Sequence, residues 1–113
     1  MNGDWFDGEY FAGTEKGGNR MVPTGHHFEL GRRVAEVFNG ARFIDVGCGI
    51  GHVVRELLNR NQDARGVEVS QYAVEHTTCP GRVKVGDVLD RSWANKNQYG
   101  VVMCWNVLEY LTE

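Results

Sequence analysis

The feature that most constrains the fold is an apolar run, residues 43–46, followed by three glycines on alternate positions, Gly47, Gly49 and Gly51. The run has the length and composition of a buried strand, and the glycines predict a tight turn into a helix. Such a turn lets a ligand lie against bare backbone at the carboxyl end of a parallel strand, where open α/β sheets bind their ligands. By itself the turn is equally consistent with a plain strand–helix connection.

The spacing of the glycines distinguishes between ligands. Dinucleotide sites carry G-x-G-x-x-G, in which the third glycine lets the helix pack closely on the strand. This chain has G-x-G-x-G, and the place of the third dinucleotide glycine holds His52, which has a full side chain. A phosphate-binding P-loop is excluded because no Gly-Lys-Ser/Thr follows.

The bulk composition indicates one small soluble domain. The chain has 113 residues, with 42% hydrophobic and 24% charged residues, and its net charge of −3 gives no basic footprint for nucleic acid. No apolar run reaches the roughly 18 residues of a membrane span, and residues 1–15 are acidic and aromatic, unlike a signal peptide. We therefore expect a cytoplasmic protein that binds neither nucleic acid nor membrane.

The cysteines point to reduced thiols. Cys48, Cys79 and Cys104 are odd in number, widely spaced and form no C-x-x-C pair, so neither a disulfide framework nor a metal site is expected. Cys48 lies at a helix N-terminus, which could lower its pKa. We favour the simpler interpretation that it is a small residue filling the turn.

Strand and helix patterns alternate along the chain. Helices are expected over residues 24–38, 51–60, 71–76 and from 106 onward, and strands over residues 42–46, 64–69, 82–85 and 99–104. The alternation predicts an α/β fold with a parallel sheet. In the first helix the apolar face is expected to hold Phe28, Val34, Val37 and Phe38, and in the second it is expected to hold Val53, Val54, Leu57 and Leu58. We divide the chain into an N-terminal aromatic cap and helix, residues 1–40, and a core, residues 41–113.

Acidic residues follow three consecutive predicted strands. Asp45 lies near the end of the first strand, Glu68 at the end of the second and Asp87 after the third. The carboxyl ends of parallel strands meet at one edge, so all three acids should lie beside the glycine turn. An acid about 20 residues after such a turn can accept hydrogen bonds from a ribose diol, which is the role we predict for Glu68.

These residues resemble the motifs of a known family. Residues 44–51, 66–70, 86–88 and 99–111 resemble, in order, four motifs of class I S-adenosylmethionine-dependent methyltransferases, particularly the small-molecule group. The resemblance covers residues 42–113 and is weaker around residues 5–13. It implies a Rossmann-like parallel sheet with flanking helices and S-adenosyl-L-methionine as cofactor.

The resemblance also implies roles for individual residues. The turn would receive the methionine part of the cofactor near the helix N-terminus. Glu68 would hold the ribose hydroxyls, and Asp87 and the Val88 backbone would bind the adenine. The implied cofactor-binding set is Asp45, Gly47, Cys48, Gly49, Gly51, Glu68, Val69, Asp87, Val88, Cys104 and Trp105.

The implied reaction is in-line methyl transfer to a small-molecule acceptor, in which the protein mainly aligns donor and acceptor. No catalytic residue can be assigned. The candidates for a general base are Glu109, His26, His27 and Tyr10, although adjacent histidines are more often structural and Glu109 could simply stabilise a helix dipole. The alternative is a non-catalytic module that binds S-adenosylmethionine or a partner.

The chain departs from the family in its length. The family's sheet has seven strands in the order 3-2-1-4-5-7-6, whereas this sequence supplies strands one to four, order 3-2-1-4, and stops within the next helix. Strand four would then be an apolar open edge. We expect the domain to self-associate through that edge.

Overall fold

The computed structural model of the chain describes residues 7–8, 11, 20–87, 89 and 98–105. Helices and strands alternate along this part of the chain, as the sequence predicts. The strands are β1 (Arg42–Val46), β2 (Asp63–Glu68), β3 (Val83–Val85) and β4 (Val101–Met103), and the helices are α2 (Gly25–Val37), α3 (His52–Asn59) and α4 (Gln71–Glu75). None of the helices among these residues has the length and apolar character needed to cross a membrane.

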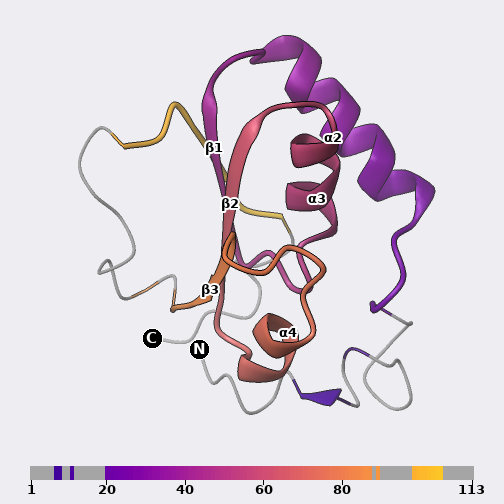
Figure 1. Cartoon of the computed structure of the whole chain (residues 1–113), viewed down its shortest axis with the longest axis vertical. Coiled ribbons are helices and arrows are strands. Elements are labelled where there is room, and N and C mark those ends of the chain that lie inside the picture. Colours follow the sequence, from indigo (N-terminus) through magenta and orange to yellow (C-terminus); the bar gives the residue numbers. More distant parts are fainter. Residues whose placement is uncertain (1–6, 9–10, 12–19, 88, 90–97, 106–113) are drawn as a thin grey trace.

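The four strands form one parallel sheet in the order β3-β2-β1-β4 (Figure 1). Val46 of β1 pairs with Val67 of β2, and Glu68 of β2 pairs with Val85 of β3. The carboxyl ends of these strands therefore meet at one edge of the sheet. The predicted α/β class, the parallel arrangement and the strand order are confirmed.

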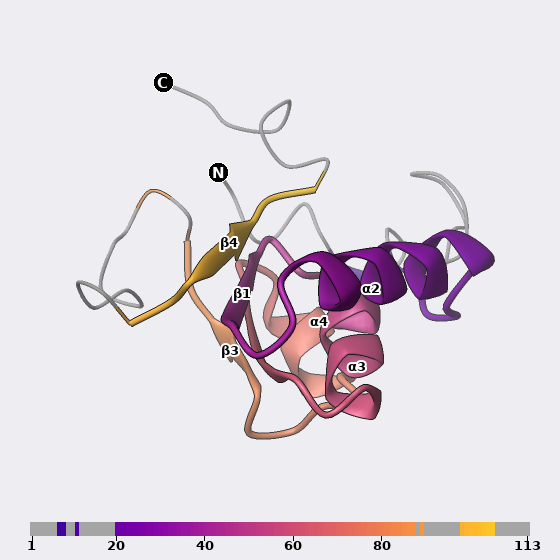
Figure 2. The same ribbon diagram turned by 90° about the horizontal axis from the view of Figure 1, so that it is seen from above.

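Helices α2, α3 and α4 lie on the same face of the sheet, as the view from above shows (Figure 2). Alternate residues of each strand point to opposite faces. The residues buried between helices and sheet include Phe43, Val53, Val54, Leu57, Ala64, Val83 and Met103. A smaller apolar cluster of Ile44, Val46 and Val67 occupies the other face.

The face of helix α2 that packs against the core is not the face that carries its large apolar residues. Phe28, Val37 and Phe38 are 48%, 72% and 47% exposed, whereas Gly31 and Ala35 are buried. The prediction for Phe28, Val37 and Phe38 was wrong because the contact is set by small residues, which let α2 approach α3 closely. The expected buried stripe of α3 is confirmed for Val53, Val54 and Leu57.

Replacing Gly31 with Ala is expected to lower the free energy of unfolding by about 1–3 kcal/mol, the usual cost of overpacking. An added Cβ at Gly31 would lie 2.7 Å from the Glu56 Cβ, inside contact distance. The matched control is Gly25→Ala in the same helix, where no atom lies within 4 Å of the added carbon. Urea unfolding should show a loss only for Gly31→Ala. Equal stability of the two variants would contradict the close helix contact.

Candidate functional site

The predicted glycine turn joins β1 to α3, and its glycines all have left-handed backbone, with φ of 79° at Gly47, 61° at Gly49 and 99° at Gly51. Side chains are rarely tolerated there, so the path of the chain requires glycine. The N–H groups of Gly47 and Cys48 donate to the Val67 carbonyl oxygen at 2.7 and 3.1 Å. The turn is thereby fixed to the end of β2.

Glu68 reaches from the end of β2 to the glycine turn. Its Oε1 accepts the Gly49 N–H at 2.9 Å, and its Oε2 accepts the Ser70 N–H at 2.8 Å. The side chain is 6% exposed. Burial raises the pKa of Glu68 above its usual value, although the backbone N–H groups of Ser70, Gly49 and Val69 act in the opposite direction. The predicted acid at this strand end thus lies against the turn and holds its shape.

Asp45 lies near the end of β1 and is only 3% exposed. Its Oδ1 has no hydrogen-bond partner within the described part of the chain. Its neighbours in register are Gly66 of β2 and Met103 of β4, and neither side chain can donate a hydrogen bond of ordinary strength. Burial raises the pKa of Asp45 to about 8, and the nearby Glu68 carboxyl adds to the rise. A buried carboxyl without a partner is costly, so this group requires a physical explanation.

Cys48 fills the turn as a small, partly buried group. A Cβ added to Gly66 would lie 2.5 Å from the Cys48 Sγ, which shows that the thiol occupies the space left by that glycine. Burial raises the pKa of the Cys48 thiol, and the carboxyls of Asp45 and Glu68 raise it further. The possibility of a thiol with a lowered pKa is therefore wrong, because burial and the two carboxyls raise the pKa of Cys48.

Asp87 follows β3 at the same edge of the sheet. Its Oδ1 accepts the Leu89 N–H at 3.0 Å. The preceding residue, Gly86, donates its N–H to the Glu68 carbonyl oxygen at 2.9 Å, so the chain leaving β3 runs beside the end of β2. Val88, the other residue predicted at this position, lies outside the described residues.

Cys104 and Trp105 follow β4, which pairs with β1, so they also leave the sheet at the edge that carries the turn. Both are exposed. Of the candidate bases, His26 is exposed in the first turn of α2. Glu109 and Tyr10 lie outside the described residues.

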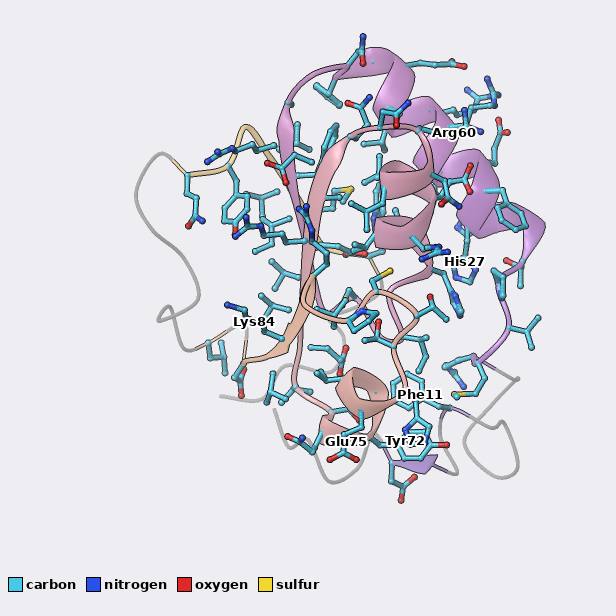
Figure 3. All side chains as sticks on the ribbon, viewed as in Figure 1. Phe11, His27, Arg60, Tyr72, Glu75 and Lys84 are labelled. Carbon is cyan, nitrogen blue, oxygen red and sulfur yellow. The ribbon has the colours of Figure 1, made fainter. Side chains whose placement is uncertain are left out.

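Phe11 belongs to the N-terminal aromatic segment that the sequence indicated, and it lies beside the turn. It is buried with Ile50 of the turn and Ala73 of α4, and Val69 packs against the same cluster. Its ring stacks on Tyr72 with centroids 6.0 Å apart, and the two labelled side chains lie together in Figure 3. A Cβ added to Gly49 would lie 3.4 Å from the Phe11 ring. An aromatic side chain thus covers one side of the turn.

His52, the first residue of α3, links this helix to the N-terminal segment. Its Nε2 lies 2.7 Å from the Arg20 carbonyl oxygen, and the Arg20 N–H donates to the Phe11 carbonyl oxygen at 2.7 Å. The His27 ring lies 4.8 Å from the His52 ring, and its Nδ1 accepts the Thr24 N–H at 2.9 Å. No sequence pattern indicated this link, because one partner is a backbone carbonyl.

A pocket of about 380 Å³ lies apart from the turn, and Arg65, Lys84 and Tyr99 are among the residues that line it. Figure 3 places Lys84 on the side of the sheet away from the helices. Neither the glycine turn nor Glu68 borders this pocket. The candidate site is therefore the strand edge with its acids, and not this pocket.

Comparison with known proteins agrees with this geometry. Residues 24–113 match the family model described as a methyltransferase domain. No sequence among the curated proteins matches the chain significantly.

Several solved methyltransferases share the fold. An amino pentose methyltransferase from Micromonospora echinaspora involved in calicheamicin biosynthesis, solved with S-adenosylmethionine bound, has a TM-score of 0.61 and 22% identity over 78% of this chain and 39% of its own. The CcbJ methyltransferase from Streptomyces caelestis has a TM-score of 0.66 and 20% identity, over 88% of this chain and 43% of its own. Magnesium protoporphyrin IX methyltransferase from Synechocystis PCC 6803 was solved with bound S-adenosylhomocysteine. It has a TM-score of 0.65 and 18% identity, over 94% of this chain and 57% of its own. The chain spans about 39% to 57% of the length of these proteins.

Proposed function

The chain belongs to the family of methyltransferase domains, and on this premise we propose that it binds S-adenosyl-L-methionine at the glycine turn for methyl transfer to a small molecule. The observation that carries the proposal is the contact of the Glu68 carboxylate with the Gly49 N–H, at 2.9 Å. This hydrogen bond joins the glycine turn to an acid that is able to accept hydrogen bonds from a ribose.

The groups at this edge fit the chemistry of that cofactor. The glycines of the turn have a left-handed backbone that other residues rarely adopt. The unpartnered Oδ1 of Asp45 is an acceptor for a cationic donor. We assign the ribose hydroxyls to Glu68, the adenine to Asp87, Val88 and Val69, and the methionine part to the turn.

S-adenosylmethionine, when bound, supplies an activated methyl group on its sulfonium. The remaining work falls to the chain, which must hold the donor in one orientation and keep the reacting centre dry. Cys104 and Trp105, at the end of β4, are assigned to the wall near the methyl group. The candidates for a general base remain His26, Glu109 and Tyr10. A base is needed only if the acceptor must lose a proton.

A second candidate function is cofactor binding without turnover. The chain covers 39% to 57% of the solved methyltransferases that it resembles, so much of the structure that those proteins possess has no counterpart in it. The described groups at this edge of the sheet bear on cofactor binding alone.

Calorimetry of the 113-residue chain with S-adenosylmethionine, S-adenosylhomocysteine and NAD tests the proposal. We expect the first two to bind and NAD to give no heat beyond dilution, because His52 stands where a dinucleotide site has glycine. Binding of NAD alone would overturn it. Release of labelled S-adenosylhomocysteine in the presence of acceptor mixtures would separate the catalytic from the non-catalytic function.

We also propose that the chain self-associates through β4. Among the described residues β4 lies at the edge of the sheet, and Val102 is 62% exposed. An unpaired apolar strand edge is a template for pairing. Sedimentation velocity should show species larger than the monomer at high concentration, reduced in Val102→Lys. A soluble monomer at all concentrations would contradict this.

A further inference from the structure

The glycine turn is held from a second side, by the segment that follows α4. The Thr77 hydroxyl donates to the Ile50 carbonyl oxygen at 2.6 Å, and its oxygen accepts the Cys79 N–H at 3.1 Å. The hydroxyl proton is therefore directed at the turn, because the Cys79 N–H takes an acceptor site of the same oxygen. Ile50 is 2% exposed, and a buried carbonyl that loses a hydrogen bond is costly.

The third glycine of the turn lies against the same segment. A Cβ added to Gly51 would lie 3.1 Å from the Val83 side chain and 3.4 Å from the Thr77 Oγ1. The Cys79 Sγ lies 3.8 Å from the Gly51 carbonyl oxygen. The last two residues of the turn, Ile50 and Gly51, are thus in direct contact with the segment after α4.

A turn built on alternate glycines depends on contacts with other elements for its shape. Glycine adopts positive and negative φ with similar ease, so the turn's own residues do not select one conformation. Glu68 holds the Gly49 N–H from the end of β2 at 2.9 Å, and Thr77 holds the carbonyl group of the next residue, Ile50. Two side chains from different elements therefore fix neighbouring residues of the turn.

We propose that Thr77 is a positioning residue for S-adenosylmethionine, whose hydroxyl holds the turn in the shape that receives the methionine part of the cofactor. This proposal rests on the proposed function and assigns Thr77 no contact with the cofactor. A turn that adopts the binding shape for only part of the time binds with an affinity reduced by that fraction. Loss of one neutral hydrogen bond should reduce the affinity about three- to tenfold.

Calorimetric titration with S-adenosylmethionine compares two variants of the same residue. Thr77→Val removes the hydroxyl and keeps the branched shape, whereas Thr77→Ser keeps the hydroxyl. We expect Thr77→Val to bind about three- to tenfold more weakly and Thr77→Ser to bind within about twofold of the wild-type chain. The matched control is Thr78→Val, which removes the neighbouring hydroxyl from an exposed side chain and should leave the affinity unchanged.

A second control separates the position of the turn from the stability of the domain. Gly31→Ala disturbs the contact of α2 with Glu56 of α3 and should destabilise the chain. At a temperature where circular dichroism shows the chain to be folded, this variant should bind the cofactor with wild-type affinity. A loss of affinity confined to Thr77→Val therefore reports on the turn and not on stability.

Amide hydrogen exchange gives a readout without cofactor. The Gly49 N–H, which donates to Glu68, should exchange about three- to tenfold faster in Thr77→Val and at nearly the wild-type rate in Thr77→Ser. The Gly66 N–H of β2, which donates to the Arg82 carbonyl oxygen at 2.8 Å, is the reference for opening of the sheet. Its rate shows how much of any change is global.

The outcomes are distinguishable from a failure of the proposed function. Wild-type affinity in Thr77→Val, an equal loss in Thr77→Ser, or an equal loss in Gly31→Ala would each overturn the positioning role while leaving cofactor binding intact. Unchanged exchange of the Gly49 N–H in Thr77→Val would overturn it as well. If the wild-type chain does not bind S-adenosylmethionine, both the proposed function and this inference fail.

Discussion

Glu68→Ala is expected to weaken binding of S-adenosylmethionine by more than tenfold. The wild-type carboxylate accepts the N–H groups of Gly49 and Ser70 at 2.9 and 2.8 Å, and in our proposal it also accepts from the ribose. Hydrogen bonds to a charged group contribute roughly 1.5–3 kcal/mol each, and about 1.4 kcal/mol corresponds to tenfold in affinity. Calorimetric titration of the variant and the wild-type chain measures the difference.

The control for Glu68→Ala is Glu75→Ala, which removes an exposed carboxylate from α4, where it accepts from the Gln71 side chain at 3.0 Å. The affinity of Glu75→Ala for S-adenosylmethionine should match that of the wild-type chain. Circular dichroism melts of both variants show whether each remains folded at the titration temperature. An unchanged affinity in folded Glu68→Ala would mean that the ribose assignment is wrong.

Asp45→Asn is expected to raise the free energy of unfolding by about 3–5 kcal/mol at pH 8. The wild-type carboxyl has a pKa of about 8 when folded, against an ordinary value of 3.8. Between these values the folded chain binds more protons than the unfolded chain, so wild-type stability falls as pH rises and levels off above about 8. Asn carries no charge, so the gain from the substitution should shrink toward zero near pH 4.

Urea unfolding at pH 4, 6 and 8 gives this comparison directly. The matched control is Asp63→Asn, which removes a carboxylate that bridges Arg42 and Arg82 at 3.3 and 2.9 Å on the surface. Exposed ion pairs of this kind contribute up to about 1 kcal/mol, so this variant should be slightly destabilised at most. A gain in Asp45→Asn that stayed constant from pH 4 to 8 would refute a raised pKa as its cause.

Much of the fold could be predicted because local patterns and topology agree. The strand Arg42–Val46 was predicted with its observed bounds, and the other strands and helices of the described residues were placed within a few residues. The helix expected from residue 106 onward lies outside the described residues. Short apolar runs separated by amphipathic helices leave few arrangements other than a parallel sheet. The face of α2 could not be predicted, because it depends on the close approach of Gly31 to Glu56, which belongs to another helix.

The position of the site was also predicted from the sequence, but the state of some of its side chains was not. The spacing of Gly47, Gly49 and Gly51 identified the turn, and the strand-end position of Glu68 put an acid beside it. The state of Cys48 and Asp45 could not be predicted, since burial by residues distant in sequence sets their pKa values. The link from His52 to Arg20 was also missed, because a side chain that bonds a backbone carbonyl leaves no pattern in sequence.

The strand order of the sheet also dictates the order in which the molecule can assemble. β1 pairs with β2 over a short intervening segment, whereas Phe43 of β1 pairs with Val101 of β4 across about half of the chain. Closing the longer segment costs more chain entropy, and contacts between distant residues form slowly. During synthesis the glycine turn and Glu68 leave the ribosome well before Trp105. The half of the site that faces the ribose and methionine can therefore be built while the strand that leads to Trp105 is still to join.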